Sequence, residues 1–179
     1  MASILSSRYQ PSPRMWHYSS QIGGKTYLWG GRTQDFHQGG KDILRSTVNV
    51  FDHYLETWKK QRTTGVPPRG LYSGAHTSHE KLLYSFAGLD GVHRQNSLNV
   101  LDTDMLVWKE LNHHCKNGPM PKSGCGMVSF GSHYLATIGG HGIPTQPLQH
   151  GSTFIKNPNY TDERGWTDEF HVFDITEGK

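Results

Sequence analysis

A group of features recurs in the same order along this chain, with a period near 50 residues. An apolar strand with a glycine pair is followed by a second β-forming segment that ends in Asp, and then by Trp. Asp52 and Asp102 are 50 residues apart, as are Trp58 and Trp108, and Asp174 follows 72 residues after Asp102. Such a period indicates several copies of one supersecondary unit, each burying its apolar face against its neighbour.

Each recurring feature has a structural role. The segments before the glycine pairs are apolar and aromatic, as in strands buried between neighbouring sheets. Adjacent glycines allow a tight exit from the strand, and the Pro-rich joints at 66–68 and 118–121 exclude helix and separate the units. With 21 Gly, 9 Pro, 8 Tyr, 7 Phe and 5 Trp, the sequence predicts an all-β fold of short strands around aromatic cores.

The repeats divide the chain into four segments. We predict an N-terminal tail over 1–12, a first repeat over 13–66, a second over 67–118 and a third over 119–179. The third repeat carries a long insert at 141–166 and stops before its Trp. Two departures from the pattern are therefore visible: this missing Trp, and Ala87 in place of the first glycine of the second pair.

This ordered set of features resembles the kelch family of β-propellers, in which each repeat forms one four-stranded blade. The resemblance covers roughly residues 13–179 and implies a partial propeller of about three blades, the third incomplete. In that fold the glycine pairs and the late Trp are structural. These residues are Gly30, Gly31, Gly88, Gly139, Gly140, Trp58 and Trp108, and we expect both tryptophans in the core.

The third repeat also resembles the subfamily of kelch domain-containing protein 2 and its relatives. The residues that carry this likeness are Gly139–Pro144 and Arg164–Val172. The resemblance implies a substrate receptor of cullin-RING ubiquitin ligases that grips C-terminal glycine tails with a six-bladed propeller. In that subfamily the carboxylate-binding arginines lie in later blades and the ligase-docking segment lies beyond the propeller, so this chain would hold only part of such a receptor.

Ligands of propellers meet the loops at one end of the central channel. The chain places polar and aromatic residues in these loops, and a ring of them can hold a peptide carboxylate, since guanidinium groups match carboxylates in shape and charge. The predicted peptide-binding residues are Trp16, Arg32, Arg94, Lys122 and His141. Other roles stay open for them: Arg32 and Arg94 as solvated loop charges, and Trp16 as blade packing. Arg14 and Arg69, which follow prolines, are expected to be structural.

Metal and catalytic motifs are weak. His113, His114 and Cys115 are adjacent and point in different directions on a strand, and His76 and His79 fall on opposite strand faces. The sequence has no nucleophile elbow, phosphate loop or paired catalytic carboxylates. The copper-oxidase chemistry of some kelch-type propellers needs a residue set that we cannot assemble here. We predict no metal, no cofactor and no enzymatic activity.

Charge and hydropathy limit the partners. The formal net charge is +3 and the basic residues are scattered, which argues against nucleic acid. No run reaches membrane-spanning length, and the first ten residues lack the apolar core of a secretory signal. We expect a protein of the cytoplasm or nucleus that binds a protein or peptide, with cullin-RING ligase components as further partners of a longer chain.

Three functions stay open from the sequence. The first is a peptide-binding substrate adaptor, the second a cytoskeletal (actin) or scaffolding module, and the third a non-functional fragment of a larger propeller. Because a propeller hides its strand edges only by closing into a ring, three blades are expected to leave apolar faces open. We therefore predict self-association or aggregation through these open blade edges.

Overall fold

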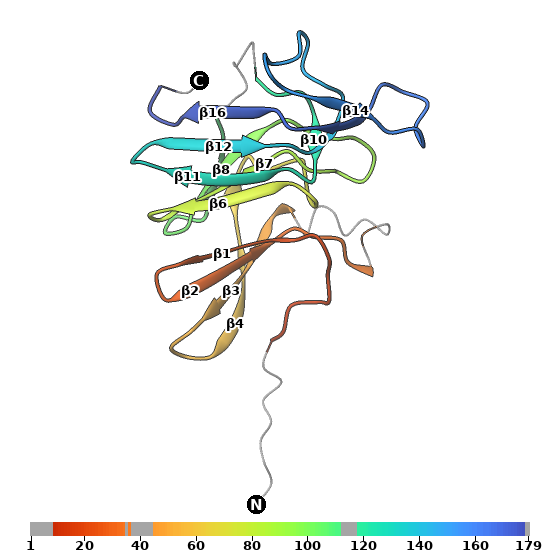
Figure 1. The fold of residues 1–179 in the computed structure, drawn as a ribbon. Coiled ribbons are helices and arrows are strands. Elements are labelled where there is room, and N and C mark those ends of the chain that lie inside the picture. The colour runs from red at the N-terminus through yellow and green to blue at the C-terminus, as the bar shows by residue number, and fades with distance from the viewer. Residues whose placement is uncertain (1–8, 35, 37–44, 112–117, 178–179) are drawn as a thin grey trace, which may run out of the picture.

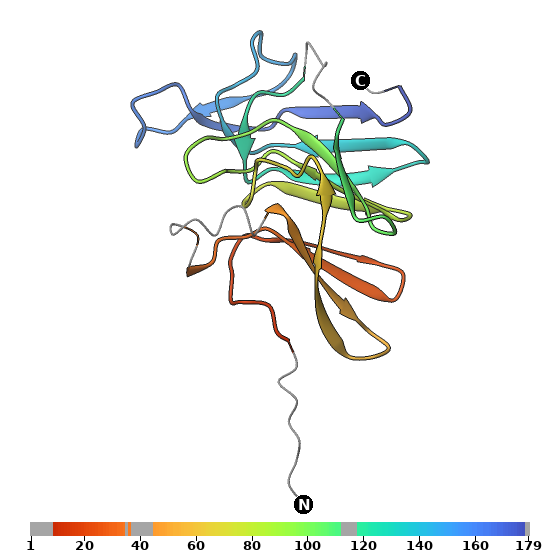
Figure 2. The same ribbon diagram turned by 180° about the vertical axis from the view of Figure 1, so that it is seen from behind.

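The computed structural model of the chain describes residues 9–34, 36, 45–111 and 118–177, and the strands of this part form an all-β fold. Three antiparallel sheets follow one another along the chain and lie face to face (Figure 1). The view from behind shows the same order, with the N-terminal sheet at one end of the stack and the C-terminal sheet at the other (Figure 2). We call these sheets blade 1, blade 2 and blade 3.

Blades 1 and 2 are complete, and the described residues supply three strands of blade 3. Blade 1 contains β1 (Tyr18–Ile22), β2 (Lys25–Trp29), β3 (Thr47–Asp52) and β4 (Thr57–Arg62). Blade 2 contains β6 (Ala75–His79), β7 (Leu82–Phe86), β8 (Leu98–Asp102) and β9 (Val107–Glu110), and blade 3 contains β11 (Gly126–Phe130), β12 (Tyr134–Ile138) and β16 (Phe170–Asp174). The prediction of about three blades, with the third incomplete, is confirmed.

Two further pairings connect the repeats. The short strand β5 (Thr64–Gly65) pairs in parallel with β9, so the end of the predicted first repeat is part of the sheet of blade 2. A small sheet combines β10 (Lys122–Ser123), β13 (His141–Gly142), β15 (Gly165–Thr167) and β14 (Phe154–Lys156), in that order. The insert of the third repeat therefore folds back onto the segment that enters blade 3. The other repeat boundaries stay a prediction.

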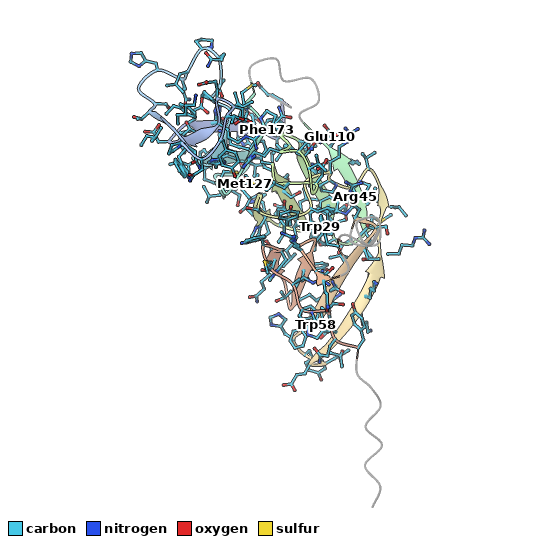
Figure 3. The ribbon with its side chains drawn as sticks, turned by 90° about the vertical axis from the view of Figure 1, so that its right-hand side faces the viewer. Trp29, Arg45, Trp58, Glu110, Met127 and Phe173 are labelled. Atoms are coloured by element: carbon cyan, nitrogen blue, oxygen red, sulfur yellow. The ribbon has the colours of Figure 1, made fainter. Side chains whose placement is uncertain are left out.

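Aromatic and aliphatic side chains fill the two interfaces between blades. Trp29 and Trp108 are buried between blades 1 and 2, with their ring centroids 5.2 Å apart. Figure 3 shows Trp29 between these blades, and Met127 and Phe173 in the upper part of the stack. The first core contains Tyr18, Tyr27, Trp29, Phe36, Val48, Val50, Leu71, Tyr72, Leu83, Leu101 and Trp108. The second contains Ala75, Tyr84, Phe86, Ala87, Leu98, Val100, Cys125 and Leu135. Each fully buried large side chain contributes about 1.5–3 kcal/mol.

The glycine pairs turn the chain out of the second strand of each blade. Gly30 has a φ of +64°, and a Cβ there would lie 2.2 Å from the Leu71 carbonyl oxygen, so no other residue fits without a shift. Ala87 occupies the corresponding position in blade 2 and adopts the same left-handed backbone, with a φ of 64°. This departure from the pattern therefore keeps the turn, at the steric cost of a Cβ in the left-handed region.

Trp58 differs from the prediction that both repeat tryptophans are core residues. It lies opposite Phe51 in blade 1, as Trp108 lies opposite Leu101 in blade 2. Trp108 is 1% exposed because it faces blade 1, whereas Trp58 is only half-buried and packs on Phe51 at 5.1 Å. Figure 3 shows Trp58 on the side of blade 1 that faces away from blade 2. No described residues form a blade on that side.

Two further findings concern membrane-spanning segments and the cysteines. No helix in the described part of the chain is long and apolar enough to cross a membrane. Cys125 is buried and carries a free thiol, whereas Cys115, His113 and His114 lie outside the described residues.

Candidate functional site

Loops from all three blades lie along the same side of the stack, where strands of each blade end, and we call this side the loop end (Figure 1). The loop between β7 and β8 is closed by a backbone bridge between Leu89 and Arg94, and bridges of Leu89 with Tyr72 and of Gln95 with Lys122 tie it to neighbouring segments. The entry to blade 1 is bridged in the same way to the loop after β2, through Met15 and Arg32. These bridges fix the backbone from which the predicted ligand-binding side chains project.

The small sheet supports the third part of the loop end. His141 on β13 lies between Ser123 on β10 and Trp166 on β15. The strands approach closely because glycines stand at the contacts: a Cβ on Gly165 would lie 2.1 Å from the Ile155 carbonyl oxygen. His141 and Trp166 therefore project from strands whose backbone is fixed by pairing within the small sheet.

Arg94 and His141 are in direct contact. The Arg94 Nε donates to the His141 carbonyl oxygen at 3.0 Å and lies 3.2 Å from Ser123 Oγ, and its Nη2 lies 2.8 Å from His141 Nδ1. Because a guanidinium group only donates, Nδ1 accepts this bond and the ring proton sits on Nε2. In this tautomer Nε2 carries a hydrogen, so its 3.2 Å contact with Asn157 Nδ2, which is itself a donor, is not a hydrogen bond. Burial, together with the positive charges of Arg94 and Arg164, lowers the pKa of His141, which keeps the ring neutral.

Exposed aromatic rings surround this pair. Trp166 is 49% exposed and meets His141 edge-on, with ring centroids 5.4 Å apart. Tyr160 is 40% exposed, its ring lies 5.3 Å from that of His141, and the Arg164 guanidinium lies 5.0 Å above it. We call Arg94, His141, Tyr160, Arg164 and Trp166 the Arg94 cluster. It combines cationic donors with accessible aromatic faces, a composition suited to protein and peptide contacts.

Lys122 does not fit the role predicted for it. Its side chain is 2% exposed, and its Nζ lies 3.1 Å from Glu169 Oε2, which is also buried. Burial alone would raise the pKa of Glu169, but hydrogen bonding from Thr145 and Lys122 and the Lys122 charge together hold it below its usual value. The Lys122 ammonium therefore forms a buried ion pair beneath the small sheet, and it is not accessible to a ligand at the surface.

The other two predicted residues lie at the joint of blades 1 and 2. Trp16 is 55% exposed, has a φ of 56° and stacks on Tyr72, with ring centroids 6.0 Å apart. Arg32 is half-buried and pairs through its backbone with Met15. The structure thus brings Arg94 and His141 together and leaves Trp16 and Arg32 on another part of the loop end. A peptide-binding role for these four residues stays a prediction.

The structural roles expected for the arginines after proline differ between the two. The Arg14 Nη1 donates to the Gly30 carbonyl oxygen at 2.8 Å, so Arg14 braces the glycine turn of blade 1. Arg69 is exposed, and its side chain makes no hydrogen bond or ion pair with the described residues.

Sequence reasoning missed the part of the site that the insert supplies. Tyr160, Arg164 and Trp166 were not among the predicted ligand-binding residues, although two exposed aromatics and an arginine within one insert are an available signal. Their position beside His141 depends on the pairing of β13 with β15, which no local pattern reveals. No group of three or more His, Cys, Asp or Glu residues in the described chain is placed to hold a metal ion.

Comparison with known proteins identifies the repeats. The family model of the KLHDC2/KLHL20/DRC7 Kelch-repeats domain matches residues 2–179. Kelch domain-containing protein 3 of Homo sapiens is 28% identical over 118 residues, which are 62% of this chain and 31% of that protein. The tRNA wybutosine-synthesizing protein 2/3/4 of Arabidopsis thaliana is 28% identical over 110 residues, 60% of this chain and 10% of that protein.

The solved structure of YjhT supports the same fold. It has a TM-score of 0.61 and 15% sequence identity, and the match covers 92% of this chain and 54% of that one. The chain spans about a third or less of the length of the curated relatives named above. A shared propeller architecture is therefore shown, whereas the activities of the longer proteins are not carried by this likeness.

Proposed function

Because the chain belongs to the KLHDC2/KLHL20/DRC7 Kelch-repeats family, we propose that its loop end binds the carboxylate-bearing tail of a protein partner through the Arg94 cluster. Kelch repeats indicate a protein-interaction module, and this proposal specifies its ligand. The observation that carries it is the Arg94 guanidinium, held by Ser123 and His141 beside two exposed aromatic rings.

The chemistry of the cluster favours a carboxylate. The described contacts of the Arg94 guanidinium use Nε and Nη2, and no described residue pairs with its Nη1. A guanidinium held in this way offers the remaining N–H groups in a fixed direction, which suits the oxygens of a carboxylate. The neutral His141 adds no charge, and Trp166 offers a face for a tail with small or apolar side chains.

A more specific proposal concerns a longer protein that would contain this module. The likeness of the third repeat to receptors of C-terminal tails supports a role as a substrate receptor for a ubiquitin ligase. Kelch domain-containing protein 3 and the matching family model support descent from the same group of propellers. Because the chain covers 31% of that relative, ligase docking is proposed only for a longer protein.

Binding of matched peptides tests the proposed ligand. Fluorescence polarisation would compare peptides of one sequence that end in glycine with either a free or an amidated C-terminus. We expect the free-acid peptide to bind at least about tenfold more tightly than the amidated peptide, since a charge-assisted hydrogen bond contributes about 1.5–3 kcal/mol. Equal affinity for both peptides would overturn the carboxylate proposal, and co-sedimentation with actin filaments would then favour the cytoskeletal function.

A further inference from the structure

The Arg94 cluster lies beside a carboxylate that belongs to the chain itself. Asp162 is in the turn between β14 and β15, and its Oδ2 forms an ion pair with the Arg164 Nη2. The backbone N–H of Arg164 also donates to Asp162 Oδ1 at 3.3 Å. Both oxygens of this carboxylate therefore contact Arg164, whose guanidinium group lies over the Tyr160 ring.

The turn that carries Asp162 is fixed to the small sheet. The backbone N–H of Asn157 donates to the Arg164 carbonyl oxygen at 3.0 Å, and that of Tyr160 donates to the Asn157 carbonyl oxygen at 3.2 Å. Asn157 is itself buried and contacts His141. The position of Asp162 next to the Arg94 cluster is therefore set by backbone pairing and by a buried side chain.

The charges of two arginines act on this carboxylate. Desolvation by itself would raise the pKa of Asp162, but hydrogen bonds from Arg164 and the positive charges of Arg164 and Arg94 hold it below its usual value. Asp162 in turn opposes the burial and the two arginine charges that lower the pKa of His141. Asp162 is therefore ionised at neutral pH and lies in the positive field that a ligand carboxylate would enter.

The ion pair of Asp162 and Arg164 is open to solvent. The two side chains are 40% and 31% exposed, and an exposed ion pair contributes little because water competes for both charges. A ligand carboxylate that meets Arg94 and Arg164 together gains charge-assisted contacts with two arginines. Such a ligand therefore has enough advantage to displace Asp162 from Arg164.

We propose that Asp162 occupies, in the free protein, a place at Arg164 that the carboxylate of a bound tail takes over. This inference rests on the proposed function of the Arg94 cluster and adds to it an internal competitor. In the bound state Arg94 and Arg164 both contact the ligand carboxylate, and Asp162 turns outward to solvent. Asp162 thereby lowers the affinity for every carboxylate, so that a ligand is retained only where it also contacts the aromatic rings.

Asp162→Asn separates this role from a structural one. The Oδ1 of Asp162 accepts from the Arg164 N–H, and the side-chain oxygen of asparagine can accept the same hydrogen bond. The substitution therefore keeps the contact within the turn and removes the charge that competes for the guanidinium group.

Glu163→Gln is the matched control in the same turn. Glu163 is exposed and pairs with Lys156 at 2.7 Å, so this variant removes an equal charge nearby and leaves the contacts of Arg164 in place. Fluorescence polarisation measures the ratio of affinities of the full chain for free-acid and amidated glycine-ending peptides. We expect Asp162→Asn to raise this ratio about two- to fivefold, the range of an exposed ion pair, and Glu163→Gln to change it much less. Equal effects of the two variants would overturn the proposal, because the loss of any nearby negative charge would then be sufficient.

The Arg164→Met background shows whether Asp162 acts through Arg164. We expect Arg164→Met to lower the affinity ratio, and Asp162→Asn added to it to have no further effect. A rise of the same size in both backgrounds would contradict competition for Arg164. Thermal unfolding confirms that these variants, all at partly exposed side chains, are folded.

The same measurements distinguish this inference from the proposed function. If the wild type and Asp162→Asn both bind the free acid and the amide equally, the carboxylate proposal fails, and the role of Asp162 fails with it. If both prefer the free acid to the same extent, only the role of Asp162 is overturned.

Discussion

Trp58 and Trp108 occupy the same position in successive blades, yet Trp108 is buried against Trp29 while Trp58 lies half-buried on the outer face of blade 1. The difference follows from what each faces. The late Trp of a blade points toward the blade before it, and in the described chain blade 1 has none before it. Comparing Trp58 with Trp108 therefore shows how much packing against a neighbouring blade adds to the stability that a Trp contributes within its own blade.

Alanine substitution of these two residues should give unequal losses of stability. We expect Trp108→Ala to cost about 3–5 kcal/mol, because it opens a cavity between blades 1 and 2. Trp58→Ala should cost about 1–2 kcal/mol, since a half-exposed side chain recovers less transfer free energy on folding. Denaturant unfolding of both variants measures the difference. Equal losses would mean that the burial of the two residues is the same in solution.

The buried pair of Lys122 and Glu169 predicts a non-additive effect. Lys122→Met leaves the Glu169 carboxylate buried without its charge partner, which should cost about 3–5 kcal/mol. The double variant Lys122→Met with Glu169→Leu removes both charges and should recover much of that loss. Denaturant unfolding of the two single variants and the double variant completes the cycle. Simple addition of the two single effects would show that the charges do not interact.

Acidification should weaken the fold before the carboxyl groups titrate. Burial lowers the pKa of His76 and, together with the Lys122 charge, that of His171. The folded state therefore binds protons less well than the unfolded state, whose histidines titrate near 6.5. The stability present above that pH is lost as the pH falls below about 6.5 toward the folded-state values. Thermal unfolding between about pH 7.5 and about pH 5.5 should show a falling Tm, with a smaller fall for His171→Gln; a constant Tm would contradict this.

The outer face of blade 3 predicts self-association. Ile138, Phe170 and Val172 occupy positions whose counterparts in blade 2 are the buried Phe86, Leu98 and Val100, yet they are 48–54% exposed. An apolar sheet face of this kind favours association with another copy. Sedimentation velocity should show the wild-type chain associating as its concentration rises. The variant Ile138→Lys with Phe170→Lys should sediment as a monomer, and a monomeric wild type would contradict the prediction.

The sequence predicts the blades because their determinants are local. Gly30 and Gly31, the Pro-rich joints and the apolar strands each act within a few residues, so their order along the chain is enough. The pair of Lys122 and Glu169 is different, because the partners are 47 residues apart and lysine is rarely buried. Only the return of the insert to β10 explains why Lys122 faces inward.

The Arg94 cluster shows the same limit in the functional site. Arg94 and His141 stand out in the sequence as polar residues in loops, and their direct contact agrees with placing them at one end of the fold. Tyr160 and Trp166 join them only because β13, β14 and β15 form a sheet whose register no period in the sequence encodes. Ligand-binding predictions from repeats alone therefore omit what inserts contribute.

Arg94 offers the most direct test of the loop end as a carboxylate-binding surface. The measurement is the ratio of affinities for free-acid and amidated glycine-ending peptides, in the wild type, in Arg94→Met and in the matched control Arg69→Met. The account predicts that Arg94→Met lowers this ratio about tenfold or more, toward one, while the exposed Arg69 can be replaced without effect on it. A folded Arg94→Met protein that still prefers the free acid as strongly as the wild type does would contradict the account.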